Sequence, residues 1–154
     1  MAQGKTKFAG RAIIASAIIL TAGALTLAGA GVGPRFTQLS GRESVSISSA
    51  SLEKGGIRFF SYHDDAGKEI RFILGRDQSG QVHGAVDACQ RCAQYGEGYT
   101  SSRGYLVCRF CGNRYRLDSR TGIASCAPVE LPVHEAGNTI TVDTTQLKRQ
   151  RNLF

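Results

Sequence analysis

Two cysteine pairs of the form C-x-x-C constrain this chain more than any other feature. The first pair is Cys89 and Cys92, the second is Cys108 and Cys111, and fifteen residues lie between the pairs. A C-x-x-C turn brings two sulfurs within reach of one metal ion, and two such turns supply the four soft ligands that suit zinc, a single iron ion or an iron-sulfur cluster. Gly112 permits the positive φ at which the chain folds back around a metal. The spacing therefore predicts a four-thiolate metal site.

Structural disulfides are the competing interpretation of these cysteines, since exported proteins often contain them. Bonds within a C-x-x-C pair tend to be redox-active, and bonds between the two pairs would leave Cys126 as an odd thiol. A thioredoxin-like role is disfavoured because neither pair opens a recognisable helix after a strand. The spacing favours the metal site.

The N-terminal segment is typical of a protein directed to a membrane. Residues 12–33 contain no charged residue and follow a basic leader with Lys5, Lys7 and Arg11. The length fits a transmembrane helix, while Ala28-Gly29-Ala30 is an acceptable cleavage site for a signal peptide. We favour a retained single-pass anchor in the inner (cytoplasmic) membrane. The basic leader places the N-terminus in the cytoplasm, so the cysteine domain faces the periplasm or the outside.

The formal charge of +7 does not indicate a nucleic-acid partner once it is located along the chain. Six of the 19 basic residues lie in the leader and in the basic tail at residues 148–154. The remaining 13 are balanced by 12 acidic residues, whereas nucleic-acid binding needs a basic face on the folded domain.

After the predicted anchor or signal at residues 1–33, the sequence divides into a Ser-rich tether at residues 34–54 and a β-rich domain at residues 55–147. The tether holds one expected strand, Ser44 to Ser48. Within the domain, runs rich in aromatic and β-branched residues are separated by Gly and Asp turns, which is typical of an antiparallel meander. We expect strands at residues 56–63, 68–76, 81–88, 104–108, 113–118 and 138–143, with a loop at 125–133 and no helix of three turns.

From Gly55 to Leu147 the order of motifs resembles the FtrD-like domain of bacterial membrane iron-sulfur proteins. That pattern is D-x-C-x-x-C, a G-Y pair, V-x-C-x-x-C-G, a short basic-aromatic strand, and C-x-P before Leu-Pro. The matching residues here are Asp87-Ala88-Cys89, Cys92, Gly98-Tyr99, Val107-Cys108, Cys111-Gly112, Arg114-Tyr115, Cys126-Ala127-Pro128 and Leu131-Pro132. The flanks of Cys126, Ser125 and Ala127, depart from the family pattern of a Gly pair before this cysteine and Asn after it.

A more distant likeness is to Rieske domains, in which two β-loops hold a two-iron cluster through cysteines and histidines. Cys92 and Cys111 would stand where those histidines are. Cys126 would lie on a covering loop as a shielding residue or a spare ligand. The two resemblances imply a mainly β fold, a small antiparallel Rieske-like or rubredoxin-like metal-binding domain behind one transmembrane helix, with a 2Fe-2S cluster as the favoured cofactor.

Zinc and mononuclear iron stay open as alternative metals. Folded iron-sulfur proteins are commonly exported by the twin-arginine route, and this leader has no Arg-Arg pair. His63, His83 and His134 are ligand candidates by residue type alone. Tyr95, Tyr99 and Tyr105 lie between the cysteine pairs and have the residue type to stack over a cluster or to pack in a small β core.

Two functions are consistent with these features. The first is a membrane-anchored iron-sulfur protein that passes single electrons. The family resemblance implies that it is an accessory of bacterial iron uptake or of a membrane redox complex, with a redox partner protein or iron-transport subunits as partners. The second is a structural zinc-ribbon-like interaction module of a membrane complex. Because no hydrolase or transferase arrangement is apparent, we expect a carrier or accessory subunit rather than an enzyme.

Overall fold

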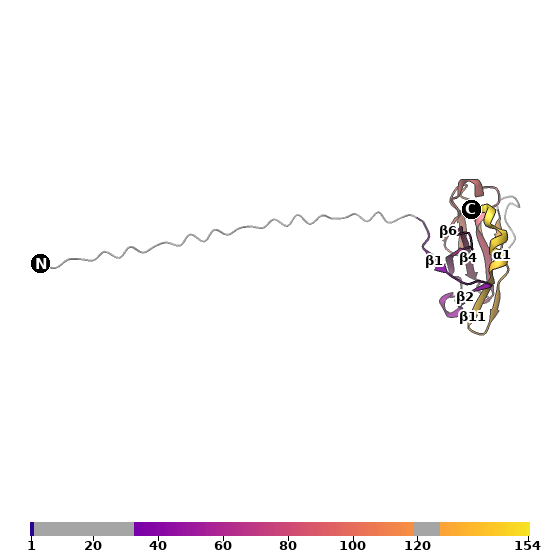
Figure 1. Ribbon diagram of the computed structural model, residues 1–154, viewed down its shortest axis with the longest axis horizontal. Coiled ribbons are helices and arrows are strands. Elements are labelled where there is room, and N and C mark those ends of the chain that lie inside the picture. The colour runs from indigo at the N-terminus through magenta and orange to yellow at the C-terminus, as the bar shows by residue number, and fades with distance from the viewer. Residues whose placement is uncertain (2–32, 119–126) are drawn as a thin grey trace. The chain divides into compact units, whose positions relative to one another are not determined.

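The computed structural model of the protein describes residues 33–118 and 127–154, together with Met1 (Figure 1). The residues from Gly33 onward belong to one compact unit. The predicted membrane anchor lies, apart from Gly33, outside the described residues. Within the described part, none of the helices has the length and apolar character needed to cross a bilayer.

The centre of the fold is a five-stranded sheet in the order β1-β3-β4-β5-β9. Strands β3 (Ile57–His63), β4 (Glu69–Arg76) and β5 (Val82–Cys89) form the expected antiparallel meander. Strand β1 (Phe36–Leu39) runs parallel to β3 at one edge, and β9 (Pro128–Glu130) pairs with β5 at the other. The prediction of a mainly β, mainly antiparallel domain is confirmed.

The two turns of the meander are closed by aspartate side chains. Asp64 Oδ1 accepts hydrogen bonds from the backbone N–H groups of Ala66 and Lys68, both at 2.9 Å. Asp77 Oδ1 accepts one from the N–H of Gln81, also at 2.9 Å. Aspartate favours turns because its short carboxylate accepts hydrogen bonds from nearby backbone N–H groups, so the two turns could be predicted from the sequence.

Two three-stranded antiparallel sheets and several short helical segments complete the fold. One sheet has the order β10-β11-β2 and the other β6-β7-β8. Their strands are β2 (Ser44–Ser48), β10 (His134–Ala136), β11 (Thr139–Asp143), β6 (Tyr99–Ser102), β7 (Tyr105–Cys108) and β8 (Arg114–Tyr115). The helical segments are α1 (Thr144–Arg149) and the 3-10 turns η1 (Ser49–Ser51), η2 (Ala93–Tyr95) and η3 (Arg151–Leu153). Helix α1 packs against β2 and β11 (Figure 1).

The central sheet is covered on both faces, which divides the core into two clusters. Alternate side chains of a strand point to opposite faces. Phe60 and Phe72 therefore pack with residues of β2, β11 and α1 on one face, while Phe59 and Ile73 pack with β6, β7 and β8 on the other. The second cluster also contains the buried cysteines. This burial of both faces explains why consecutive residues such as Phe59 and Phe60 in β3, and residues 72–74 in β4, are all apolar.

Two segments that we expected to lie outside the domain are folded into it. The expected tether supplies β1, the predicted strand β2 and η1, and Val45 and Ile47 of β2 are buried. The basic tail forms the end of α1 and η3, where Lys148 pairs with Asp65 at 2.8 Å. Arg151 also lies 3.4 Å from Asp64, so two ion pairs hold the tail on the domain surface.

Arg76 at the end of β4 ties the central sheet to the β10-β11-β2 sheet. Its guanidinium binds Glu135 of β10 through two hydrogen bonds, at 2.6 and 3.2 Å. It also donates to the Ser49 hydroxyl at 2.7 Å and to the carbonyls of Leu52 and Gly80 at 2.8 and 2.7 Å. A planar guanidinium suits this set of acceptors, because its five donors point in fixed directions.

Candidate metal centre

The first cysteine pair lies where β5 leaves the central sheet. Cys89 is the last residue of the strand, and the N–H of Cys92 donates to its carbonyl at 2.9 Å, which closes the C-x-x-C turn. The turn continues into η2, which ends at Gly96 with φ +66°. Both cysteine side chains point into the second core cluster and are buried.

The second pair lies at the end of β7. The N–H of Cys108 donates to the carbonyl of Asn113 and the N–H of Gly112 to that of Cys108, both at 2.9 Å, so the chain turns back tightly into β8. Gly112 has φ +72°, and an added methyl group would meet nothing within 4 Å. The backbone conformation, rather than lack of space, therefore explains the glycine, as the sequence predicts.

The two cysteine turns meet at one site. The Sγ atoms of Cys89, Cys92 and Cys108 all lie within 4.8 Å of one another, and all three residues are buried. Cys111 is exposed, and its thiol adds to the rise that burial causes in the pKa values of the Cys92 and Cys108 thiols. The structure thus gathers three of the four predicted thiols in its interior, while Cys111 lies at the surface in the same turn as Cys108. Cys126 lies outside the described residues.

The chemistry of these donors fits a cationic metal group. A tetrahedral ion with sulfurs at about 2.3 Å separates those sulfurs by about 3.8 Å, which the spacing here accommodates. Burial raises the pKa of the Cys92 thiol, and the neighbouring thiols raise it further. Burial also raises the pKa of Cys108, although the backbone N–H groups of Cys111 and Phe110 act against it. A bound cation would replace these protons and stabilise the thiolates.

Two buried tyrosines form the inner wall of the site. Tyr99 of β6 is fully buried and hydrogen-bonds to Cys89; burial first, and then the charge of Cys89, raises the pKa of its phenol. Its ring meets that of Tyr115 edge to face, with centroids 6.1 Å apart. The sequence analysis identified Tyr115 only as part of the basic-aromatic strand after the second pair and did not predict its place in the wall of the site. Tyr105 instead lies against Arg114, with the guanidinium 4.7 Å from its ring centroid.

Asp87 is a buried carboxylate two residues before Cys89. Its Oδ1 accepts a hydrogen bond of 2.7 Å from the N–H of Tyr99, and its Oδ2 lies 3.7 Å from Nε of Arg71. Burial raises the pKa of Asp87 to about 7. Gly98 has φ +67°, and an added Cβ would lie 2.5 Å from Oδ2. This aspartate therefore fixes β6, and with it Tyr99, against the end of β5.

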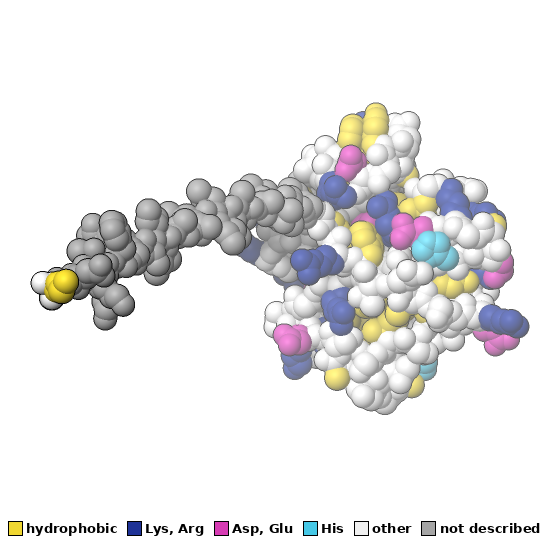
Figure 2. All heavy atoms as spheres, turned by 60° about the vertical axis from the view of Figure 1, so that its left-hand side comes forward, with side chains coloured by type: hydrophobic (Ala, Val, Ile, Leu, Met, Phe, Trp, Pro, Cys, Tyr) yellow, Lys and Arg dark blue, Asp and Glu magenta, His cyan; other side chains and the backbone are white. Residues whose placement is uncertain are grey.

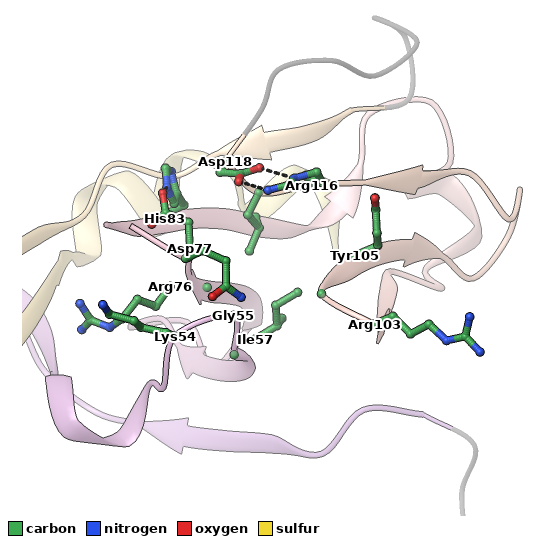
Figure 3. A pocket seen from close by; sticks show the side chains of 15 residues that line it. Lys54, Gly55, Ile57, Arg76, Asp77, His83, Arg103, Tyr105, Arg116 and Asp118 are labelled. Carbon is green, nitrogen blue, oxygen red and sulfur yellow. Dashed lines mark hydrogen bonds and ion pairs between the residues drawn. The ribbon is translucent and has the colours of Figure 1, made fainter. Parts of the chain in front are cut away.

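The three histidines, all among the described residues, lie outside the group of thiols. His83 pairs with Asp77 at 2.9 Å and lines an open cavity of about 340 Å³ with Arg116 and Asp118 (Figure 3). His63 lies near Gln38, and His134 is on β10. Among the described residues, the grouping of metal-ligating side chains consists of Cys89, Cys92 and Cys108.

The chain was compared with curated proteins, solved structures and protein families. Among curated proteins, none matches the chain significantly. Two solved structures align with 66% of it: the quaternary ammonium Rieske monooxygenase CntA, at 12% identity and a TM-score of 0.47, and a putative NADH-dependent nitrite reductase small subunit from Mycobacterium tuberculosis, at 16% identity and a TM-score of 0.40. The alignment covers 31% of the monooxygenase chain and 96% of the reductase subunit.

A family model described as membrane iron-sulfur containing protein FtrD-like matches residues 52–154. The matched region begins just before β3 and includes both cysteine turns, Asp87, Gly98 and Tyr99. It agrees with the family that the motifs of the sequence resemble. The chain belongs to the FtrD-like family of membrane iron-sulfur containing proteins.

Proposed function

We propose that this protein is a membrane-anchored electron carrier that holds an iron-sulfur cluster through Cys89, Cys92, Cys108 and Cys111. The observation that carries the proposal is the meeting of three buried thiols within 4.8 Å, with the fourth cysteine in the same turn as Cys108, in a member of an iron-sulfur family. Such a cluster takes up and releases one electron at a time. A 2Fe-2S cluster is the form we favour.

The residues around the thiols suit this role. The side chains of Tyr99, Leu106 and Tyr115 are buried around the inner thiols and exclude water from them. Backbone N–H groups of Phe110 and Cys111 stabilise the Cys108 thiolate. Cys111 lies at the surface, so this edge of the site is the shortest route for an electron to or from a partner.

The cellular setting is part of the same proposal. The apolar segment at residues 12–33 anchors the protein in the inner membrane by a single span, and the basic leader places the cysteine domain outside the cytoplasm. The resemblance to the family supports a role beside bacterial iron uptake or in a membrane redox complex. There the protein would carry electrons to or from transport subunits.

The spacing of the thiols also supports a second function, that of a structural zinc module. Sulfurs within 4.8 Å of one another also fit a single ion, so one zinc held by the same thiols would suit a structural module. Zinc removal would then unfold the domain, because structural zinc supplies about 10–16 kcal/mol in small zinc peptides.

Cysteine variants test which thiols hold the metal. In full-length protein purified without oxygen, we expect Cys89→Ser and Cys108→Ser to lose most of the iron and acid-labile sulfide, because each removes a buried ligand. Cys126→Ser serves as the comparison, and we expect it to retain the metal. Full iron content in both Cys89→Ser and Cys108→Ser would refute the ligand assignment, while its loss in Cys126→Ser would make Cys126 a ligand. Zinc in place of iron in the unmodified chain would support the second function.

A further inference from the structure

An exposed aromatic pair stands beside the candidate metal centre. Tyr95 follows the first cysteine turn and Phe110 lies within the second, and their rings stack with centroids 3.8 Å apart and planes 7° apart. Each side chain is 51% exposed. Among the described residues, they are the large hydrophobic side chains left exposed apart from Met1. We call Tyr95 and Phe110 the aromatic tip.

Arginines accompany the aromatic tip. Arg91 is the third residue of the first C-x-x-C turn and Arg109 the second residue of the other, and both are exposed. Arg109 donates to the carbonyl of Glu97 at 3.0 Å and pairs with its carboxylate at 3.4 Å. Arg91 adds a further positive charge, so the surface is cationic as well as aromatic. On the face drawn in Figure 2, hydrophobic side chains project at the top with charged side chains just below them.

The chain enters the folded domain at the same place. A methyl group added at Gly33 would lie 3.7 Å from Nη1 of Arg109, so the backbone at Gly33 passes directly beside this arginine. Gly33 is also the last residue of the apolar segment predicted to be the anchor. The next residues already belong to the fold, because β1 begins at Phe36. Little chain is therefore left to act as a spacer between an anchor and the domain.

We propose that the aromatic tip, with Arg91 and Arg109, rests on the headgroup region of an anionic membrane. Tyrosine is enriched at the membrane-water interface, and phenylalanine and arginine are common in amphipathic helices that lie in that interface. Basic residues there are attracted by anionic lipids. The inference rests on the membrane-anchored part of the proposed function and is independent of the metal's identity. It also places the exposed Cys111 next to the bilayer, where a membrane-embedded partner reaches it more readily than a soluble one.

A tryptophan placed at the tip tests this contact, because the natural chain contains no tryptophan. The full-length Phe110→Trp protein is inserted into phosphatidylcholine vesicles that contain phosphatidylglycerol, with plain or brominated acyl chains. Bromine quenches tryptophan only at close range. We expect a blue-shifted emission that loses about half its intensity in the brominated vesicles, since interfacial aromatic side chains lie at the headgroup and acyl boundary.

The control is His134→Trp, an exposed position on β10. The next residue, Glu135, binds Arg76 at the end of β4, whereas Cys89 ends the antiparallel neighbour β5. The control therefore lies toward the opposite end of the central sheet, and we expect no bromine quenching there. Equal quenching at the two positions would overturn the proposal. If Phe110→Trp fails to fold, Tyr95→Trp takes its place.

Charge reversal separates lipid from protein as the occupant of this surface. With Arg91→Glu and Arg109→Glu added to Phe110→Trp, we expect bromine quenching to fall about twofold in the anionic vesicles. Unchanged quenching would contradict the role of the arginines. A tryptophan that is unquenched in vesicles but shielded from iodide in native membranes would overturn lipid contact in favour of a protein partner. Iron and sulfide measured on the same samples keep this result separate from the proposed function.

Discussion

At Gly98, both the backbone conformation and the packing of a neighbouring side chain require glycine. Its φ of +67° lies in the left-handed region, and an added Cβ would lie 2.5 Å from Oδ2 of the buried Asp87. Tyr99, which follows it, reaches Cys89. A change at Gly98 should therefore disturb both the fold and the wall of the site.

We predict that Gly98→Ala destabilises the domain by about 3 kcal/mol, from left-handed strain and the contact with Asp87. The matched control is Gly104→Ala, whose φ is +76° but whose added methyl group meets nothing within 4 Å. It should cost only about 1–2 kcal/mol. Urea unfolding of the two variants measures the difference. Equal losses would show that the carboxylate moves aside freely.

Tyr99 offers a test of hydrogen bonding to a candidate ligand. Its phenol bonds to the Cys89 sulfur, and a hydrogen bond to sulfur favours the more negative, reduced state of a cluster. We predict that Tyr99→Phe lowers the midpoint potential by about 40 mV, the equivalent of one hydrogen bond of about 1 kcal/mol. Tyr105→Phe, whose hydroxyl interacts with Arg116, should leave the potential unchanged. A redox titration followed by absorption decides between them, and equal potentials in both variants would rule out this role for Tyr99.

At the scale of elements, the ion pair between Arg76 of β4 and Glu135 of β10 should make stability depend on pH. The hydrogen bond from Arg76, and then that from Ser49, holds the pKa of Glu135 below its usual value of 4.5. The carboxylate therefore contributes stability above that value and loses it as the pH falls through the lower folded-state pKa.

We predict that Glu135→Gln lowers stability at neutral pH and flattens the acid side of the stability curve. Urea midpoints measured from neutral pH down to about pH 3 report this change. Glu53→Gln, at an exposed glutamate, should leave the change of stability with pH as it is in the natural chain. An unaltered acid slope in Glu135→Gln would mean that other groups govern acid unfolding.

The strands that were predicted from the sequence are those with local signals. Strands β3, β4 and β5 combine apolar runs with aspartate turns, and their observed bounds nearly match the prediction. Strands β1 and β9 carry no comparable pattern and are defined by pairing with distant strands. Helix α1 is too short for a helical period, yet it begins with a capping bond from Thr145 N–H to Asp143 at 2.6 Å. Tertiary contacts, which a local pattern does not contain, determine these elements.

At the scale of the whole molecule, the four cysteines predicted from spacing include the three whose thiols meet in the structure, but spacing did not predict how the site is enclosed. Spacing alone pointed to the four cysteines. It did not separate the three buried thiols from the exposed Cys111, because burial depends on the sheet that packs over them. The contact between Arg71 of β4 and Asp87 of β5 beside the site also depends on strands that the fold brings together.

The central claim is that these thiols hold a redox-active iron-sulfur cluster. The most direct test is an absorption and electron paramagnetic resonance measurement on the full chain, expressed with its own leader and purified without oxygen, before and after reduction with dithionite. We expect a visible absorption that bleaches on reduction, together with a paramagnetic signal and stoichiometric iron and sulfide. A colourless protein that contains one zinc ion per chain would contradict it.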